Sequence, residues 1–73
     1  MARETVEVPI TGKIIDVNVK PGDQVKEGDV LCTLESMKME NPILSPVDGT
    51  VTEVGVKPEQ VVKPGEKIAV IDY

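Results

Sequence analysis

The residues of this chain that could carry chemistry lie close together in one stretch, Glu35-Ser36-Met37-Lys38-Met39-Glu40. An amine becomes a nucleophile once a base removes its proton, so Lys38 is a candidate for covalent modification. Two bulky apolar side chains, Met37 and Met39, stand beside it. On this string alone, the methionines could equally fill gaps in a core, and Lys38 could be an ordinary surface lysine. The elements around the stretch must decide between these interpretations.

Other reactive groups are scarce. The sequence contains no histidine and a single cysteine, Cys32, which excludes a histidine-based triad, an internal disulfide and a cysteine-based zinc site. The acidic residues are spread along the chain, and no pair of them suits acid–base catalysis. A chain of 73 residues also has little room for a deep cleft of its own. We therefore predict no catalytic residue, no metal site and no autonomous enzyme.

Charge and composition limit the partners. The net charge of −5 argues against a nucleic-acid partner and against an anionic membrane surface. No apolar run approaches the length of a membrane span, and Arg3, Glu4 and Glu7 interrupt any signal-peptide core. Apolar residues make up 40% and charged residues 29% of the chain, as in an ordinary soluble globule. We expect a monomeric domain in the cytoplasm, or in the mitochondrial matrix of a eukaryote, without membrane insertion.

The apolar residues favour strands. Valine and isoleucine, which are β-branched and suit a pleated surface, far outnumber leucine, and phenylalanine and tryptophan are absent. Six glycines and six prolines divide the chain into short segments. The longest segment free of both is 29–41, which is better explained as a strand entering a turn than as a helix. We predict an all-β protein.

The chain repeats itself once, without a gap, at a shift of 37 residues. Nine of the 27 positions in 9–35 are identical to their counterparts in 46–72. We predict one domain spanning 1–73, built from halves 2–36 and 39–73 of about four strands each and related by a pseudo-two-fold axis. Lys20-Pro21-Gly22-Asp23 predicts a type II turn, whereas Lys57-Pro58-Glu59-Gln60 lacks the glycine, so we expect type I there. Cys32 falls on Ala69, which indicates a small apolar pocket.

The junction of the repeats gives the reactive stretch its place. Met37 and Lys38 are left over as the turn between the halves, and such a tip is exposed to solvent. This position favours a partner-facing role for the methionines over a core role. The repeat also carries Ser36 onto Tyr73 and Met39 onto Ala2. The chain termini should therefore lie together at the far end of the domain.

The sequence as a whole resembles the biotinyl domains, which are the biotin carboxyl carriers of biotin-dependent carboxylases, decarboxylases and transcarboxylases. The resemblance rests on Glu35-Ser36-Met37-Lys38-Met39-Glu40, Gly28-Asp29-Val30-Leu31-Cys32 and Ser45-Pro46-Val47-Asp48-Gly49, and the family usually has alanine in place of Ser36. It implies a flattened β-barrel, the barrel-sandwich hybrid, of two four-stranded antiparallel sheets. The gapless repeat leaves no room for the short thumb that one bacterial type of acetyl-CoA carboxylase carrier inserts.

The resemblance also implies the function. Biotin would be joined by an amide to Lys38, flanked by Met37 and Met39, with Glu35 and Ser36 read by a biotin–protein ligase. A separate ligase is needed because the chain has no histidine to deprotonate the lysine. In the family, the ureido nitrogen of biotin takes up carbon dioxide, and the arm carries it from a biotin carboxylase or carboxyl-donor site to a carboxyltransferase site. The domain itself would be a carrier without catalysis.

Two alternatives stay open at this point. A lipoyl carrier domain shares the swinging-arm principle and also has a glutamate three residues before its lysine, as Glu35 is here. Lipoyl domains usually place aspartate or valine before that lysine and alanine after it, where this chain has Met37 and Met39. The second alternative is an unmodified interaction module on the same barrel plan, in which Glu35 is a plain strand-end charge like its counterpart Asp72.

Overall fold

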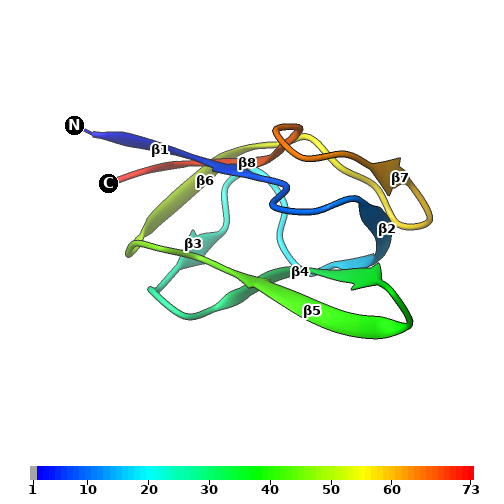
Figure 1. The fold of residues 1–73 in the computed structure, drawn as a ribbon. Coiled ribbons are helices and arrows are strands. Elements are labelled where there is room, and N and C mark those ends of the chain that lie inside the picture. The colour runs from blue at the N-terminus through cyan, green and yellow to red at the C-terminus, as the bar shows by residue number, and fades with distance from the viewer. Residues whose placement is uncertain (1) are drawn as a thin grey trace.

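The computed structural model describes residues 2–73, and in this range every regular element is a strand (Figure 1). The strands are β1 (Arg3–Glu7), β2 (Gly12–Val17), β3 (Gln24–Val25), β4 (Val30–Ser36), β5 (Met39–Leu44), β6 (Gly49–Val54), β7 (Val61–Val62) and β8 (Lys67–Asp72). The prediction of an all-β protein is confirmed. Within the described residues no helix is long and apolar enough to cross a membrane.

The strands form two antiparallel sheets of four strands each, in the orders β1-β8-β6-β3 and β5-β4-β2-β7. A shift of 37 residues carries the first order onto the second, strand by strand, so the pseudo-two-fold exchanges the sheets. Each sheet takes two strands from each half of the repeat, which is why neither half could fold alone. The predicted barrel-sandwich architecture is confirmed, and the molecule is elongated, at 36 × 18 × 16 Å.

The connections between strands also have equal lengths in the two halves. The first and second strands of the halves are joined by residues 8–11 and 45–48. The second and third strands are joined by 18–23 and 55–60, and the third and fourth by 26–29 and 63–66. Within residues 2–73, neither half therefore carries a segment that the other lacks, as the gapless repeat predicted. Only the turn 37–38 has no counterpart inside the chain.

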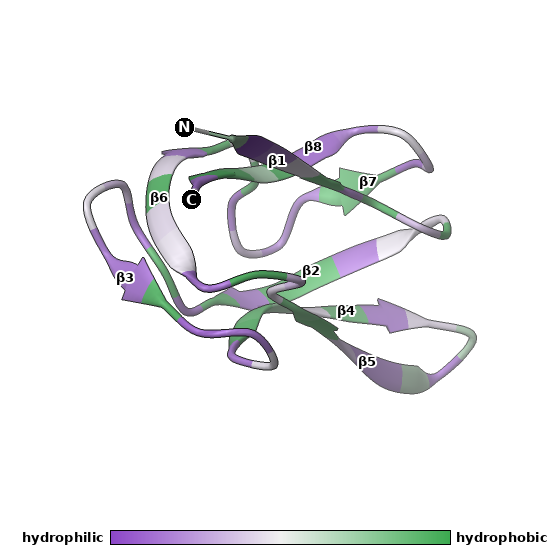
Figure 2. Cartoon of the chain, turned by 90° about the vertical axis from the view of Figure 1, so that its left-hand side faces the viewer, coloured by the Kyte–Doolittle hydropathy of each residue, from purple (hydrophilic) through white to green (hydrophobic). Residues whose placement is uncertain are grey.

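The core lies between the sheets and is aliphatic. Its larger cluster contains Val8, Ile14, Cys32, Leu34, Val56, Val62, Ile68 and Ala69, and a smaller cluster contains Val25, Leu31, Val51 and Ile71. Figure 2 shows the two layers, with polar and apolar residues mixed along the strands of both. The β-branched side chains that fill this space have few rotamers to lose on burial, which suits a thin two-layer core.

The turn at 57–60 differs from the sequence-based expectation. Glu59 has a φ of 73°, so this turn has the positive φ of type II at its third position, and the prediction of type I is wrong. The counterpart Gly22, with a φ of 99°, donates its backbone N–H to Val51 O at 2.7 Å, and Glu59 donates to Ile14 O at the same distance. The pairing of the turn with the neighbouring sheet has overridden the conformational preference of glutamate.

The two ends of the molecule are related by the same pseudo-two-fold. At one end Ser36 pairs with Met39 beside the β4–β5 turn. At the other end Ala2 and Tyr73 exchange two backbone hydrogen bonds of 2.8 and 2.9 Å. The termini therefore lie together at the end opposite the turn, as predicted (Figure 1).

Candidate functional site

The β4–β5 hairpin closes with a two-residue turn formed by Met37 and Lys38. Both residues have positive φ values, 55° and 65°, as a type I′ turn requires. The twist of this turn matches that of the flanking strands, which holds the tip in a defined position. A non-glycine residue in this region costs roughly 1–2 kcal/mol, so the turn concentrates backbone strain at the candidate site.

The side chains of the tip face solvent. Met37 is 91% exposed and Met39 is 67% exposed, and Lys38 is exposed between them. Neither methionine therefore fills the core, which removes the structural interpretation of the Met-Lys-Met string. Within residues 2–73, the Lys38 ammonium has no ion-pair or side-chain hydrogen-bond partner. A primary amine held at a fixed tip without a polar partner is suited to accept an acyl group in amide linkage.

Asn41 fixes the base of the tip from the inner side of the hairpin, a role that the sequence analysis missed. Its Nδ2 donates to Met39 O at 3.3 Å and to Leu34 O at 3.4 Å. The amide thus links the two strands just before the turn. Its counterpart in the other sheet is Glu4, which has no amide donor, and this difference between the repeats was the available signal.

Glu35 and Ser36 lie on opposite faces of β4. Ser36 is half-buried and pairs with Met39, next to the turn. Glu35 is exposed on the outer face, directly opposite Glu40 on β5 and beside Lys13 on β2. The structure therefore brings both residues near the tip, but it gives neither a hydrogen bond or an ion pair with Lys38 within residues 2–73.

Lys13 pairs with Glu35 across β2 and β4. Its Nζ contacts Glu59 Oε2 at 2.7 Å. The hydrogen bond to Glu59, followed by the charge of Glu59, raises the pKa of Lys13, and Glu35 adds a smaller attraction. Lys13 thus interacts with the carboxylates of both Glu59 and Glu35.

Cys32 is a core residue, as the repeat indicated. It is fully buried in the same cluster as its counterpart Ala69. Burial, with a smaller contribution from the charge of Asp16, raises the pKa of the thiol to about 11. A thiol in this state is a poor nucleophile at neutral pH, because the thiolate is the reactive form.

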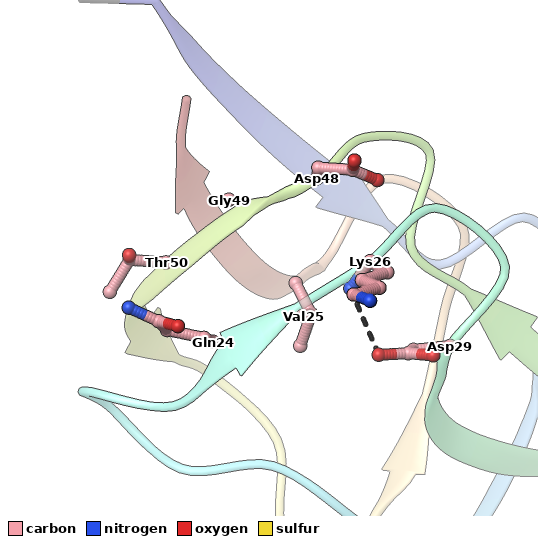
Figure 3. Close-up of a pocket in the computed structure, with 7 residues that line it drawn as sticks. All are labelled: Gln24, Val25, Lys26, Asp29, Asp48, Gly49 and Thr50. Carbon is pink, nitrogen blue, oxygen red and sulfur yellow. Dashed lines mark hydrogen bonds between the residues drawn. The ribbon is translucent and has the colours of Figure 1, made fainter.

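A shallow hollow of about 540 Å³ lies elsewhere, beside the edge strand β3 and its neighbour β6 (Figure 3). It is lined by Gln24, Val25, Lys26, Asp29, Asp48, Gly49 and Thr50. Its carboxylates already cap turns: Asp29 accepts from Lys26 N at 2.9 Å and Asp48 from Glu27 N at 2.7 Å. The hollow belongs to the sheet that does not carry the tip, so it is separate from the Lys38 site.

Comparison with known proteins identifies relatives of one kind. A family profile described as "Biotin-requiring enzyme" matches residues 4–71. The glutaconyl-CoA decarboxylase subunit gamma of Acidaminococcus fermentans is 62% identical over 40 residues, which cover 55% of this chain and 28% of that subunit. A "Biotinylated protein TB7.3 homolog" of Mycobacterium leprae is 50% identical over 42 residues, which cover 58% of this chain and 59% of the relative. The matched region is thus under two thirds of the length of either curated relative.

Solved structures share the fold over nearly the whole chain. The urea carboxylase of Kluyveromyces lactis matches with a TM-score of 0.88 and 28% identity, over 99% of this chain and 6% of the enzyme. A single-chain, multi-domain long-chain acyl-CoA carboxylase matches with a TM-score of 0.86 and 28% identity, over 93% of this chain and 7% of that chain. The fold described above is therefore found as a small part of much larger proteins.

Proposed function

Since the chain belongs to the family of biotin-requiring enzymes, we propose that it is a biotin carboxyl carrier domain with biotin in amide linkage to Lys38 Nζ. The observation that carries the assignment is the exposed Lys38 in a strained two-residue turn, between two exposed methionines. The family profile and the biotinylated proteins among the relatives support biotin as the group attached.

Each residue of the tip has a separate task in this proposal. Lys38 supplies the amine, and the type I′ turn fixes the direction in which that amine leaves the barrel. Met37 and Met39 present apolar surface that partner enzymes contact, since exposed side chains of this size contribute nothing to the core. Glu35 and Ser36, one on each face of β4, are read by the ligase that attaches the cofactor.

The ligase has to supply the general base for attachment. Only a neutral amine can attack an activated acyl group. Within residues 2–73 the structure places no carboxylate in an ion pair with Lys38. Attachment removes one positive charge, so the net charge changes from −5 to −6.

Once attached, biotin supplies a ureido nitrogen that takes up and gives off a carboxyl group. The chain's own contribution is positional: the barrel keeps Lys38 at the end of a rigid hairpin and so raises the concentration of the arm near the partner sites. We infer that these partners are a biotin carboxylase or carboxyl-donor enzyme and a carboxyltransferase. The single-domain boundaries, the monomeric state and the cytoplasmic location stay predictions.

Lys38→Arg tests the attachment site. The variant should fold as the wild type does, because an exposed turn residue contributes little packing. Incubation with a biotin–protein ligase, ATP and biotin should add one biotinyl group to the wild type by intact mass and none to the variant. Biotin found on Lys20, Lys57 or another lysine of the variant would overturn the assignment.

Lipoate is the second candidate, because Glu35 stands three residues before Lys38 as in lipoyl domains. A competition decides between them: the chain is incubated with a biotin ligase and a lipoyl ligase together with both cofactors, and the product is weighed. We expect the biotinyl form to dominate, since the two flanking methionines suit a biotin ligase. A dominant lipoyl form would refute the proposed function, and an unmodified chain would favour an interaction module.

A further inference from the structure

Sulfur side chains are concentrated beside Lys38. The sequence contains three methionines and one cysteine, and the structure describes all of them except Met1. Met37 and Met39 flank Lys38 at the tip of the hairpin, whereas Cys32 lies in the core. The two thioethers are thus next to the amine that the proposed function uses. A reaction of either thioether therefore alters the surroundings of that amine.

Exposure separates these sulfur atoms by reactivity. Cys32 is fully buried, and burial raises the pKa of its thiol to about 11, so the reactive thiolate is scarce and shielded from solvent. A thioether carries no proton to lose, so its access to an oxidant decides its reaction. Met37 is 91% exposed and Met39 is 67% exposed. Among residues 2–73, the sulfur atoms that a dissolved oxidant can reach are therefore those of the tip.

The fold tolerates oxidation at both positions. Oxidation of a buried methionine places a polar oxygen in a core and disrupts it. Neither Met37 nor Met39 belongs to the two core clusters. The inner face of β5 runs from Ile43, which packs against the core, through half-buried Asn41 to exposed Met39 beside the turn. The oxidised protein should thus keep its fold, and only the surface of the tip changes.

The oxidation is a two-electron oxygen transfer from a hydroperoxide. The thioether sulfur attacks the hydroxyl oxygen of the peroxide, an S–O bond forms and the O–O bond breaks. The sulfur is oxidised, and the hydroperoxide is reduced to an alcohol, or to water in the case of hydrogen peroxide. The proton of the transferred hydroxyl passes to the departing oxygen, so no other reactant is needed. The product is methionine sulfoxide, which methionine sulfoxide reductases return to the thioether.

We propose that Met37 and Met39 form a reversible oxidation site, at which a hydroperoxide slows carboxyl transfer by the biotin arm on Lys38. This inference rests on the proposed function, in which the two side chains present apolar surface that partner enzymes contact. A sulfoxide oxygen that is pressed against an apolar surface loses its hydrogen bonds to water. Oxidation thus replaces an apolar contact on each side of Lys38 with a desolvated polar group.

The hairpin backbone keeps the oxidised side chains beside the arm. Met37 has the positive φ of the type I′ turn, and Met39 pairs with Ser36 where β5 begins. Both positions are therefore fixed relative to Lys38. A partner that accepts the arm meets both side chains, and a sulfoxide at either position changes the surface that it contacts.

The site of oxidation can be mapped before biotin is attached. The full protein that contains the chain is treated with graded doses of hydrogen peroxide, freed of peroxide and digested with trypsin. Trypsin places Met37 in peptide 27–38 and Met39 in peptide 39–67, so tandem mass spectrometry locates each added oxygen. We expect one oxygen on each methionine at doses that leave Cys32 unmodified. The Tm of the doubly oxidised protein should stay within about 2 °C of the untreated value.

The chain offers a matched control for the position of the methionines. Met37→Leu with Met39→Leu removes both thioethers, and it also reports any oxidation of the thioether that biotin itself contains. Val61→Met in this double-leucine background restores one exposed methionine away from the tip. Val61 is 68% exposed, as Met39 is 67% exposed, and it lies on β7, at the edge of the sheet opposite β5.

The effect on carboxyl transfer is measured on protein that already carries biotin, so recognition by the ligase does not enter. Each form is biotinylated, weighed, oxidised and freed of peroxide before the biotin carboxylase and carboxyltransferase of the same host are added. Each rate is compared with that of the same form without peroxide. We expect kcat/KM of the wild type to fall about fivefold or more and to return after treatment with both types of methionine sulfoxide reductase. The double-leucine form and its Val61→Met derivative should stay within about twofold of their own untreated rates.

Four outcomes would overturn the oxidation site. In the map, they are oxidation of Cys32 before the methionines, or no oxygen on Met37 and Met39. In the transfer assay, they are an unchanged kcat/KM of the doubly oxidised wild type, or an equal loss in either control form. If the ligase attaches no biotin, the proposed function fails and the effect on carboxyl transfer fails with it, while the map still decides where the protein is oxidised.

Discussion

The strain in the tip turn can be measured by replacing it with the sequence that type I′ turns prefer. Met37→Asn combined with Lys38→Gly gives Asn-Gly, which accepts positive φ at both positions. Relief of strain gains roughly 1–2 kcal/mol per residue, and the added freedom of glycine in the unfolded chain costs about 0.5–1 kcal/mol. Asparagine keeps part of the strain, so we expect a net gain of about 1 kcal/mol.

Unfolding in urea, followed by far-ultraviolet circular dichroism, would measure this gain. For a domain of this size, 1 kcal/mol corresponds to a rise in Tm of roughly 4–8 °C. Little packing is lost, since Met37 is 91% exposed and Lys38 is exposed as well. Removing a positive charge from a chain of net charge −5 acts in the opposite direction, so a rise in stability would come from the backbone. The variant should also lose biotinylation.

Two controls separate strain from other effects. Lys38→Arg keeps the positive φ and the charge, so its stability should equal that of the wild type. Met39→Gly places glycine in a strand, where it should lower stability by about 0.5–1 kcal/mol. If the Asn-Gly variant is no more stable than Lys38→Arg, the turn is not strained, and the idea that stability is sacrificed there to present the lysine fails.

Three further predictions concern single features of the fold and the site. Met37→Leu with Met39→Leu keeps the apolar volume, so the Tm should change by less than about 2 °C while carboxyl transfer by the holo-protein slows more than biotin attachment; a large fall in Tm would restore a core role. Glu59→Gly should raise the free energy of unfolding by about 0.5–1 kcal/mol and Gly22→Ala should lower it by a similar amount, measured in urea; a loss in the first variant would show that the ion pair of Glu59 outweighs its strain. Because the pKa of Cys32 is raised from an unfolded value of 9.0 to about 11, its stabilisation is complete below pH 9 and should be lost between pH 9 and 11. Comparing pH–stability curves with Cys32→Ala isolates this effect, and parallel curves would contradict it.

Much of the fold could be predicted because the sequence repeats. Two gapless copies set the number of strands in each half, and the residues left over set the position of the turn at Met37 and Lys38. Alternation decides which side chains face the core in β1, where Glu4 and Val6 are half-buried between exposed neighbours, but register shifts interrupt it in β2, β4 and β6. The interleaving of the halves within each sheet could not be read from the repeat, because pairing within a half and pairing between halves satisfy the same alternation.

The site was predicted less completely than the fold, for a physical reason. Lys38 and the methionines are marked by residue type and position, so their exposure follows from the turn. Asn41 differs from its counterpart Glu4 in the repeat, but this difference does not give its role, which depends on a carbonyl of Met39 and a carbonyl of Leu34 that only the folded hairpin brings within reach. The positive φ of Glu59 was missed for a related reason, since tertiary hydrogen bonding imposed it against local preference.

The repeat also separates what folding needs from what function needs. Positions that have the same type of residue in both halves are mostly buried or in turns, as Val25 and its counterpart Val62 in the core show. Changes of residue type at exposed positions occur on the hairpin that carries Lys38, where a salt bridge gives way to two carboxylates, and on the edge strands, where exposed Gln24 of β3 has the exposed counterpart Val61 on β7. A symmetric ancestor of two equal halves would need none of these changes to fold. Departures from internal symmetry are therefore candidates for functional surface that local propensity does not mark, and the exposed Lys38 turn separates the hairpin from the other departures.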